Sequence, residues 1–258
     1  MALIKRQLQK EIQNRMFCGK AIILIGARQV GKSTLFEQIL GNPQLGVGSD
    51  QILTIYCDDA ESRRLLENSS LTDLRQQLSG KRLVVVDEAQ RVQGVGLTLK
   101  LITDHFKDIQ LLVTGSSSFM LQGKLNEPLT GRKFEYHLYP FSTKELFDEG
   151  GLLRVRQTFE SRLIYGSYPD VVTGAGNPRD LLMNLSGSYM YQDLLSLEGV
   201  RKPVLLEKIL VALALQVGSE VSYNELAQTV GTDNKTVEKY IDLLEKCFVI
   251  FRLNGLSR

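Results

Sequence analysis

Eight residues near the amino terminus, "GARQVGKS" from Gly26 to Ser33, match the pattern G-x-x-x-x-G-K-[ST] at every fixed position. Glycines let the backbone curl until several N–H groups point at one anion, and a following helix adds its positive amino end. Lys32 would place a cation between the β- and γ-phosphates of a nucleotide, and the Ser33 hydroxyl would reach Mg²⁺. The alternative is an ordinary glycine-containing turn. The pattern favours a phosphate loop, because a strand-like segment precedes it and a helix-like segment follows.

A pair of carboxylates, Asp87 and Glu88, ends the apolar run in "LVVVDEAQ". One carboxylate at a strand end can hold the Mg²⁺ shell, and a second can orient an attacking water. The alternative is two solvated carboxylates, which are common at strand ends. Together with the phosphate loop, the pair indicates a hydrolytic site.

A third apolar run, "LLVTGSSS" from Leu111 to Ser118, ends in hydroxyl side chains. Sites in parallel sheets gather at the carboxyl ends of strands. We therefore expect Thr114, Ser116 or Ser117 to hydrogen-bond the γ-phosphate or the water. A serine-rich loop that only caps a helix is the alternative.

The segments that carry these residues alternate in pattern. Short runs rich in β-branched residues predict strands at 21–25, 52–56, 83–86, 109–114 and 134–138. Helix-like segments at 33–40, 60–78 (with breaks) and 97–106 lie between them, and an amphipathic helix is predicted at 3–16. This alternation predicts an α/β fold, in which helices cover both faces of a five-stranded parallel sheet.

The remainder of the chain has a different pattern of predicted elements. Residues 142–200 show only helix-like stretches, broken by "YGSYPD" and "GAGNP". After about Lys202 the chain has two helices, a turn, a third helix with Asp233 or Thr232 as its N-cap, and a strand "VIFRL". This is the order of a winged helix-turn-helix. We therefore predict three parts: a nucleotide-binding core over 1–141, a helical lid-like region over 142–200 and a winged helix-turn-helix over 201–258.

Composition limits the classes of partner. The net charge of the 258 residues is only +2, too small to indicate a nucleic-acid or membrane partner. Three scattered cysteines make neither a disulfide framework nor a metal spacing, so we expect a reducing, cytoplasmic setting. Charges interrupt every short apolar stretch at the amino terminus, and no apolar run is long enough to span a membrane, so we expect neither a signal peptide nor a membrane anchor.

With these motifs in this order, the chain resembles the AAA+ ATPases. The order of the phosphate loop, "VVVDE", "VTGSSS" and "TGRKFEYHLYPFS" is similar to their Walker A, Walker B, sensor 1 and arginine regions. More narrowly, "GARQVGKSTL", "DEAQ", "TGSSS" and "IYGSYPD" resemble the prokaryotic AAA-family ATPases in which a winged helix and a nuclease-like domain of unknown function follow the core. In that family the chain continues well past "FRLNGLSR", so we expect a truncated or unusually short member.

The resemblance implies a role for each matching residue. It makes Asp87 the magnesium-shell carboxylate together with Ser33, and Glu88 the carboxylate that activates water. It suggests Ser116 as sensor 1, with Thr114 as the competing residue. It makes Arg132 an arginine finger that reaches a neighbouring subunit, against the alternative of a surface arginine at a strand start. The phosphates and metal would be held by Gly31, Lys32, Ser33 and Thr34.

Some assignments stay open. The other loop residues, Gly26, Ala27, Arg28, Gln29 and Val30, complete the expected nucleotide-binding set, in which Arg28 and Gln29 are either structural or in contact with nucleotide. No sensor 2 arginine stands out among Arg154, Arg156 and Arg162.

Three functions are compatible with these residues. The first is a Mg²⁺-dependent ATPase that couples hydrolysis to a conformational change in a partner or in its own carboxy-terminal part. A homo-oligomer is compatible with this function. The second is a nucleotide-switched regulator that binds duplex DNA through Asn234, Lys235, Thr236 and Lys239. The balanced charge of 201–258, with eight Lys and Arg against seven Asp and Glu, speaks against strong DNA binding. The third, an interaction module with a degenerate site, conflicts with the intact phosphate loop and carboxylate pair.

Overall fold

The computed structural model describes residues 3–115, 128–190 and 202–255, with backbone only for 188–190. The chain divides into two compact units, Met1–Leu182 and Met183–Arg258. Each unit is described by itself. The division differs from the three predicted parts, because residues 142–182 of the predicted lid-like region belong to the same compact unit as the sheet.

The first unit contains a sheet of five parallel strands in the order β2-β3-β4-β1-β5. This arrangement confirms the predicted sheet. The strands are β1 (Ala21–Gly26), β2 (Ile52–Tyr56), β3 (Leu83–Asp87), β4 (Gln110–Gly115) and β5 (Lys133–Leu138). Every residue of β1 and β4 is buried, as expected for central strands that are covered on both faces.

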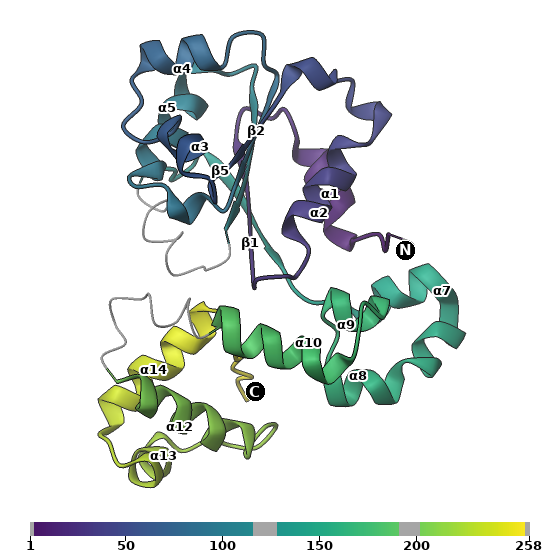
Figure 1. The fold of residues 1–258 in the computed structure, drawn as a ribbon, viewed down its shortest axis with the longest axis vertical. Helices are drawn as coiled ribbons and strands as arrows, with labels where there is room; N and C mark the ends of the chain where they lie inside the picture. The colour runs from purple at the N-terminus through teal and green to yellow at the C-terminus, as the bar shows by residue number, and fades with distance from the viewer. Residues whose placement is uncertain (1–2, 116–127, 191–201, 256–258) are drawn as a thin grey trace. The chain divides into compact units, whose positions relative to one another are not determined.

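Helices cover both faces of the sheet (Figure 1). On one face lie α1 (Gln7–Arg15) and α2 (Lys32–Leu40), and on the other lie α3 (Ala60–Arg64), α4 (Leu71–Gln77) and α5 (Val95–His105). Single 3-10 turns occur at η1 (Pro43–Leu45), η2 (Ser49–Gln51) and η3 (Ala89–Arg91). The helix-like segment over 60–78 is broken, as predicted, and the break includes Asn68, with a φ of 54°, and Ser70, which caps α4.

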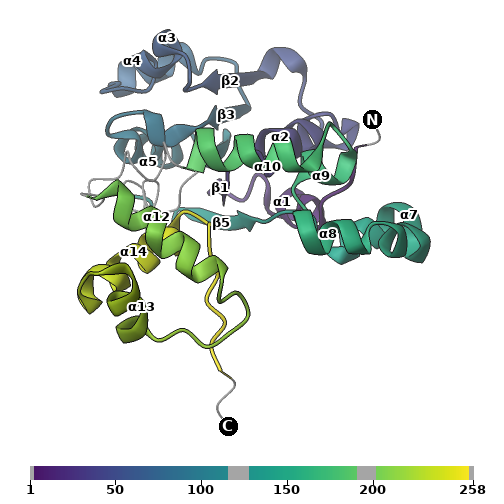
Figure 2. The same cartoon turned by 60° about the horizontal axis from the view of Figure 1, so that its bottom comes forward.

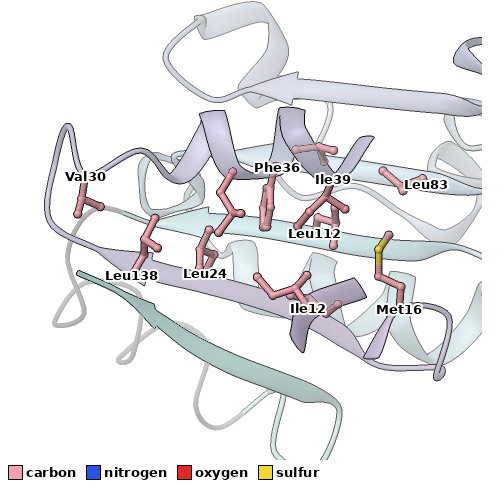
Figure 3. Packing of buried hydrophobic residues seen from close by; sticks show 12 residues of the cluster. Ile12, Met16, Leu24, Val30, Phe36, Ile39, Leu83, Leu112 and Leu138 are labelled. Carbon is pink, nitrogen blue, oxygen red and sulfur yellow. The ribbon is translucent and has the colours of Figure 1, made fainter. Parts of the chain in front are cut away.

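The core between the sheet and the α1–α2 layer is shown in Figure 3. Phe36 and Ile39 of α2 and Ile12 of α1 pack on Leu24 and Leu112 of the two central strands. Val30 of the predicted phosphate loop belongs to this cluster and is fully buried. The loop is therefore anchored in the core through a position that the motif leaves unspecified.

A helical segment follows β5 within the first unit. It contains α7 (Thr143–Gln157), α8 (Phe159–Tyr165), α9 (Pro169–Thr173) and α10 (Pro178–Asn184), whose last residues reach into the second unit. Ser142 and Glu145 form a capping box at the start of α7, and Gly151 kinks that helix with a φ of 67°. The expected interruptions at "YGSYPD" and "GAGNP" separate α8 from α9 and α9 from α10.

The second unit contains the π-helical turn η4 (Leu185–Met190) and three helices, α12 (Pro203–Ala214), α13 (Tyr223–Val230) and α14 (Asn234–Lys246), which pack together (Figure 2). Asp233 caps α14 by accepting a hydrogen bond from the Thr236 N–H, which confirms one of the two predicted caps. The predicted strand over Val249–Leu253 is wrong, because residues 250–255 have no regular structure. A strand needs a hydrogen-bonded partner strand, and the described part of this unit contains none.

None of the described helices is both long and apolar enough to cross a membrane.

Candidate nucleotide-binding site

The loop from Gly26 to Ser33 joins β1 to α2, as the sequence predicts. Gly26 must be glycine, because a Cβ atom there would lie 2.4 Å from the Leu138 carbonyl oxygen at the end of β5. Gly31 has a φ of 94°, in the left-handed region that glycine tolerates, and Gln29 is also left-handed with a φ of 57°. These two turns curl the backbone ahead of α2. The sequence thus provides glycine where the loop has least room and most curvature.

Lys32 is buried inside this loop, with 5% of the residue exposed. Its Nζ donates hydrogen bonds to the carbonyl oxygens of Gly26, at 3.1 Å, and Ala27, at 2.9 Å. The same nitrogen lies 3.9 Å from Glu88 Oε1. The cation is therefore held at the loop entrance, between backbone carbonyls and a carboxylate.

Three chain segments converge on Asp87, the last residue of β3. Ser33 Oγ, at the start of α2, donates to Asp87 Oδ1 and Oδ2, both at 3.1 Å. Thr114 Oγ1, near the end of β4, donates to Asp87 Oδ1 and accepts a hydrogen bond from the Glu88 N–H at 2.9 Å. Neighbouring parallel strands bring their carboxyl ends to one edge, which explains the convergence.

Glu88 has a left-handed backbone, with φ 55° and ψ 44°. This conformation is unfavourable for a residue with a side chain and occurs mostly where function or packing requires it. It turns the chain sharply after β3, and the carboxylate accepts a hydrogen bond from Gln90 Nε2 at 2.5 Å. Gln90 is a contact that the analysis of the sequence did not identify, although it belongs to the quoted "DEAQ".

The oxygen atoms around Asp87 fit a hard cation. Two hydroxyls and one carboxylate are the ligand types that Mg²⁺ accepts. The described residues contain no group of three or more His, Cys, Asp or Glu side chains that could enclose a metal by themselves. A cation that retains waters and takes ligands from a bound phosphate suits this sparse set, and Mg²⁺ behaves in that way.

Cys57, just after β2, lies beside the same edge. Its N–H donates to the Asp87 carbonyl oxygen at 3.0 Å, and the residue is fully buried. Burial and, secondly, the negative charge of Asp87 raise the pKa of the Cys57 thiol to about 12. The thiol is therefore neutral at physiological pH and adds no charge to the site.

Of the three predicted hydroxyl residues at or after the end of β4, Ser116 and Ser117 lie outside the described residues, and Thr114 is the one that the structure describes. Arg132 does not join this group. Arg132 precedes β5, at the amino edge of the sheet, where its carbonyl oxygen accepts from the Ala21 N–H. Six residues along β5 separate it from Leu138, the partner of Gly26 at the start of the phosphate loop, a distance of about 20 Å at 3.3 Å per residue.

Arg132 is instead paired within its own surroundings. Its Nε donates to Asp104 Oδ1 at 2.6 Å, and this hydrogen bond holds the pKa of the Asp104 carboxyl below its usual value. The guanidinium side chain is 40% exposed. Arg132 therefore cannot contact a nucleotide bound to its own subunit.

The remaining candidates are distributed as follows. Ala27 is buried, Arg28 is partly buried, and Gln29 and Thr34 are exposed at the loop and at the start of α2. Of the three candidates for sensor 2, Arg154 is ion-paired with Glu149 at 3.3 Å. Arg162 donates to the Thr143 and Thr158 hydroxyls. Arg156 is exposed.

Arg6 was missed by the analysis of the sequence. Its Nη1 donates to the carbonyl oxygen of Val30 in the phosphate loop at 2.9 Å, and the residue is only 7% exposed. The sequence offers no signal for it, because Lys5 and Arg6 are adjacent basic residues and only the fold distinguishes the exposed one from the buried one.

Comparisons with known proteins agree with this architecture. A family model described as an AAA domain matches residues 19–147, half of the chain, and one described as a domain of unknown function matches residues 156–258. An uncharacterized protein of Haemophilus influenzae is 28% identical over 251 residues, covering 89% of this chain and 61% of that protein. An uncharacterized protein of Methanocaldococcus jannaschii is 20% identical over 273 residues, covering 97% and 60%. This chain thus spans about three fifths of the length of these relatives.

A solved structure extends the agreement to the fold. The Walker-type ATPase of Pyrococcus abyssi superimposes with a TM-score of 0.63 at 18% identity, covering 95% of this chain and 90% of that one. The parallel sheet, the loop between β1 and α2, and the family model lead to the same assignment. The chain belongs to the AAA domain family and has the fold of an AAA+ P-loop ATPase.

Proposed function

We propose that this protein binds ATP with Mg²⁺, hydrolyses it, and couples its nucleotide state to a conformational change in a partner or in its own carboxy-terminal region. The family and the fold support nucleotide binding and hydrolysis. One observation carries the proposal to this chain: Ser33, Asp87 and Thr114 are joined by hydrogen bonds at the mouth of the loop that holds Lys32.

Each residue has a definite task in this proposal. Backbone N–H groups between Gly26 and Ser33 bind phosphate oxygens, and Lys32 leaves its two carbonyl acceptors to bind the β- and γ-phosphates. Glu88 orients and polarises the attacking water, with Gln90 fixing the direction of its carboxylate. Thr114 fixes Asp87 and the Glu88 backbone relative to each other. Positioning and charge neutralisation supply most of the catalysis of phosphoryl transfer.

Mg²⁺ would be held by Ser33 Oγ and, through its shell, by Asp87. When bound, the ion neutralises charge on the β- and γ-phosphate oxygens. Ser33 already lies within hydrogen-bond distance of both Asp87 oxygens, so the two ligand groups need little rearrangement to share one cation.

Arg132 would act only from a neighbouring copy of the chain. At the amino edge of the sheet it is too far from the nucleotide bound to its own subunit. Its partly exposed guanidinium can leave Asp104 and bind a phosphate of the nucleotide on a neighbouring subunit. This role requires a homo-oligomer, so it makes the rate per subunit depend on protein concentration.

The proposal is tested by measuring phosphate release from ATP with Mg²⁺ and with excess chelator. We expect turnover that needs Mg²⁺ and disappears in Lys32→Ala. Tight binding of ATP with no turnover under any condition, at high protein concentration, would contradict the hydrolytic part and favour a nucleotide-controlled switch.

A nucleotide-switched DNA-binding regulator is the second candidate. The observation that favours it is the start of α14, which follows the short helix α13: Asn234, Lys235 and Lys239 are exposed in its first two turns. Turnover measured with and without duplex DNA distinguishes the candidates. A regulator would bind DNA differently in its ATP and ADP states, whereas the ATPase described above would be indifferent to DNA.

A further inference from the structure

Arg6 is a buried cation that lies outside every motif of the sequence. Its side chain is 5% exposed and that of its ion-pair partner Glu145 is 7% exposed, and the two are joined from Nε to Oε1 at 3.0 Å. A buried charge is costly unless all of its hydrogen-bonding groups have partners. Arg6 therefore occupies a place that the fold has built around it.

The partners of Arg6 come from three separate segments. Nη1 donates to the Val30 carbonyl oxygen of the phosphate loop at 2.9 Å, and Nη2 donates to the Tyr139 carbonyl oxygen just after β5. The guanidinium carbon also lies 4.6 Å from the centre of the Phe141 ring. Burial lowers the pKa of Arg6, and the charge of Glu145 opposes that shift, so the guanidinium remains charged at neutral pH.

The contact with Val30 has a geometric consequence for its neighbour. A trans peptide is planar, so its C=O and the following N–H point in opposite directions. When Arg6 holds the Val30 oxygen on one side, the Gly31 N–H is directed to the other side. On the Val30 side, the buried side chain of Val30 holds this peptide in place. On the other side, Gly31 has no side chain and a φ of 94°, so it does little to restrain the orientation of the peptide.

Glu145 extends this arrangement to α7. Its Oε1 accepts from the Gln7 N–H at 2.9 Å, and its Oε2 accepts from the Ser142 N–H at 2.8 Å in the capping box of α7. The orientation of one phosphate-loop peptide is therefore linked, through two side chains, to the start of α1 and the start of α7.

We propose that Arg6 is a positioning residue that orients the peptide between Val30 and Gly31, so that the Gly31 N–H faces the nucleotide phosphates and moves together with the start of α7. This inference rests on the proposed nucleotide site. Arg6 itself does not touch the reacting atoms; it acts through the Gly31 N–H.

The first test is Arg6→Lys. Lysine keeps the charge opposite Glu145 but replaces a planar fork with a single ammonium, which cannot serve Glu145, Val30 and Tyr139 together. We expect affinity for a non-hydrolysable ATP analogue, measured by calorimetry, to fall about tenfold, as the loss of one hydrogen bond to a charged group predicts. The amide resonance of Gly31 in ¹⁵N-labelled protein without nucleotide should shift or broaden.

Arg63→Lys is the matched control. Arg63 also donates from one side chain to two backbone carbonyls, those of Cys57 and Asp58, at 2.8 and 2.9 Å, and both carbonyls lie outside the phosphate loop. Its substitution should leave the Gly31 resonance in place and the affinity within about twofold of wild type. This control separates positioning from a general loss of packing.

A second variant guards against misfolding. Arg6→Met with Glu145→Gln removes both charges, so that neither is left buried alone, and glutamine can still accept one of the cap hydrogen bonds. We expect it to fold and to show the same weakened affinity as Arg6→Lys. Folded variants with wild-type affinity would overturn the inference, whatever the Gly31 resonance shows.

The experiment also separates this inference from the proposed function. If the wild-type protein bound no nucleotide, the proposed function would fail, and the Gly31 resonance alone would decide the positioning role. A changed resonance in Arg6→Lys but not in Arg63→Lys would support that role, and an unchanged one would reject it.

Discussion

In the first unit, the ends of β1, β3 and β4 bring a lysine, two hydroxyls and two carboxylates to one edge of a sheet, whereas in the second unit three amphipathic helices leave charges of both signs on their exposed faces. The first arrangement is joined by hydrogen bonds from Ser33 and Thr114 to Asp87. In the second, α14 alternates exposed Lys235, Glu238, Lys239 and Asp242. The first unit thus gathers its polar and charged side chains at one place, whereas the second spreads its charged side chains over its surface.

This difference shows why one unit is easier to interpret than the other. A triphosphate and a hard cation have fixed geometry, so a site for them needs particular residue types at particular spacings. A surface that contacts another macromolecule can be built from many combinations of side chains. The predictions below test where that distinction holds, beginning with the largest effect.

Lys32→Ala should abolish nucleotide binding. It removes the cation that now donates to the Gly26 and Ala27 carbonyl oxygens and that would leave them to bind the β- and γ-phosphates. Calorimetry with an ATP analogue measures the loss, and Lys20→Ala, which changes a lysine at the opposite end of β1, should bind as wild type does. Unchanged affinity in Lys32→Ala would show that the first unit does not bind nucleotide through this loop, and the contrast between the two units would then fail.

Arg132→Ala tests whether the first unit is complete without a neighbour. An arginine finger contributes roughly 10³–10⁵ in rate, so the variant should lose most of its turnover while still binding ATP. In the wild type, activity per subunit should rise with protein concentration. Mixing Arg132→Ala with Glu88→Gln should restore part of the activity, because each variant supplies the group that the other lacks.

The matched control for Arg132 is Arg82→Ala. Arg82 also precedes a strand at the amino edge, and its carbonyl oxygen accepts from the Gln110 N–H as that of Arg132 accepts from Ala21. Its removal should leave turnover nearly unchanged. Full turnover in Arg132→Ala, with a rate per subunit independent of concentration, would show that Arg132 serves only to pair with Asp104.

Glu88→Gln should leave ATP bound but slow hydrolysis by about 10²–10⁴, the usual contribution of a general base. The substitution preserves side-chain size and the contact with Gln90, while Asp87 keeps its hydroxyl partners. Phosphate release and calorimetry together check this result, with the exposed Glu37→Gln as the control. Equal turnover in Glu88→Gln and wild type would transfer the water-orienting role to another group.

The strands and the phosphate loop could be predicted from the sequence because their signals are local. Apolar runs rich in β-branched residues predicted all five strands, and the spacing of Gly26, Gly31, Lys32 and Ser33 predicted the loop. Predicted element ends differ from the observed ones by a few residues, as at α1, which begins at Gln7 rather than at Leu3. Helix ends depend on contacts that one segment does not contain.

Long-range contacts could not be predicted in this way. The pairing of Arg6 with Glu145 joins residues 139 positions apart, and burial alone distinguishes Arg6 from the adjacent Lys5. The strand expected at 249–253 shows the opposite error: its β-branched and aromatic residues suited a strand, but strand formation needs a partner that composition does not supply. Both errors arise where structure depends on distant parts of the chain.

The smallest effect is expected in the second unit. Residues 201–258 carry eight Lys and Arg against seven Asp and Glu, and Asp233 at the start of α14 is held charged by hydrogen bonds from Thr236, which lower the pKa of its carboxyl. A DNA-recognition helix usually presents its first turn to the duplex, and here that turn begins with an acidic residue. Phosphate contacts supply most non-specific affinity for DNA, so little affinity should remain.

We therefore expect the whole protein to bind duplex DNA weakly, with a shallow dependence on salt, in both its ATP-analogue and ADP states. Fluorescence anisotropy over a series of salt concentrations measures both quantities. Lys235→Ala with Lys239→Ala, which removes the two exposed cations of α14, should change the affinity by less than about twofold, because few phosphate contacts would be lost. Nanomolar binding at physiological salt that falls in this double variant and depends on the bound nucleotide would assign a recognition function to the second unit. It would also show that a nearly neutral surface can be as specific as the phosphate loop, against the distinction drawn between the two units.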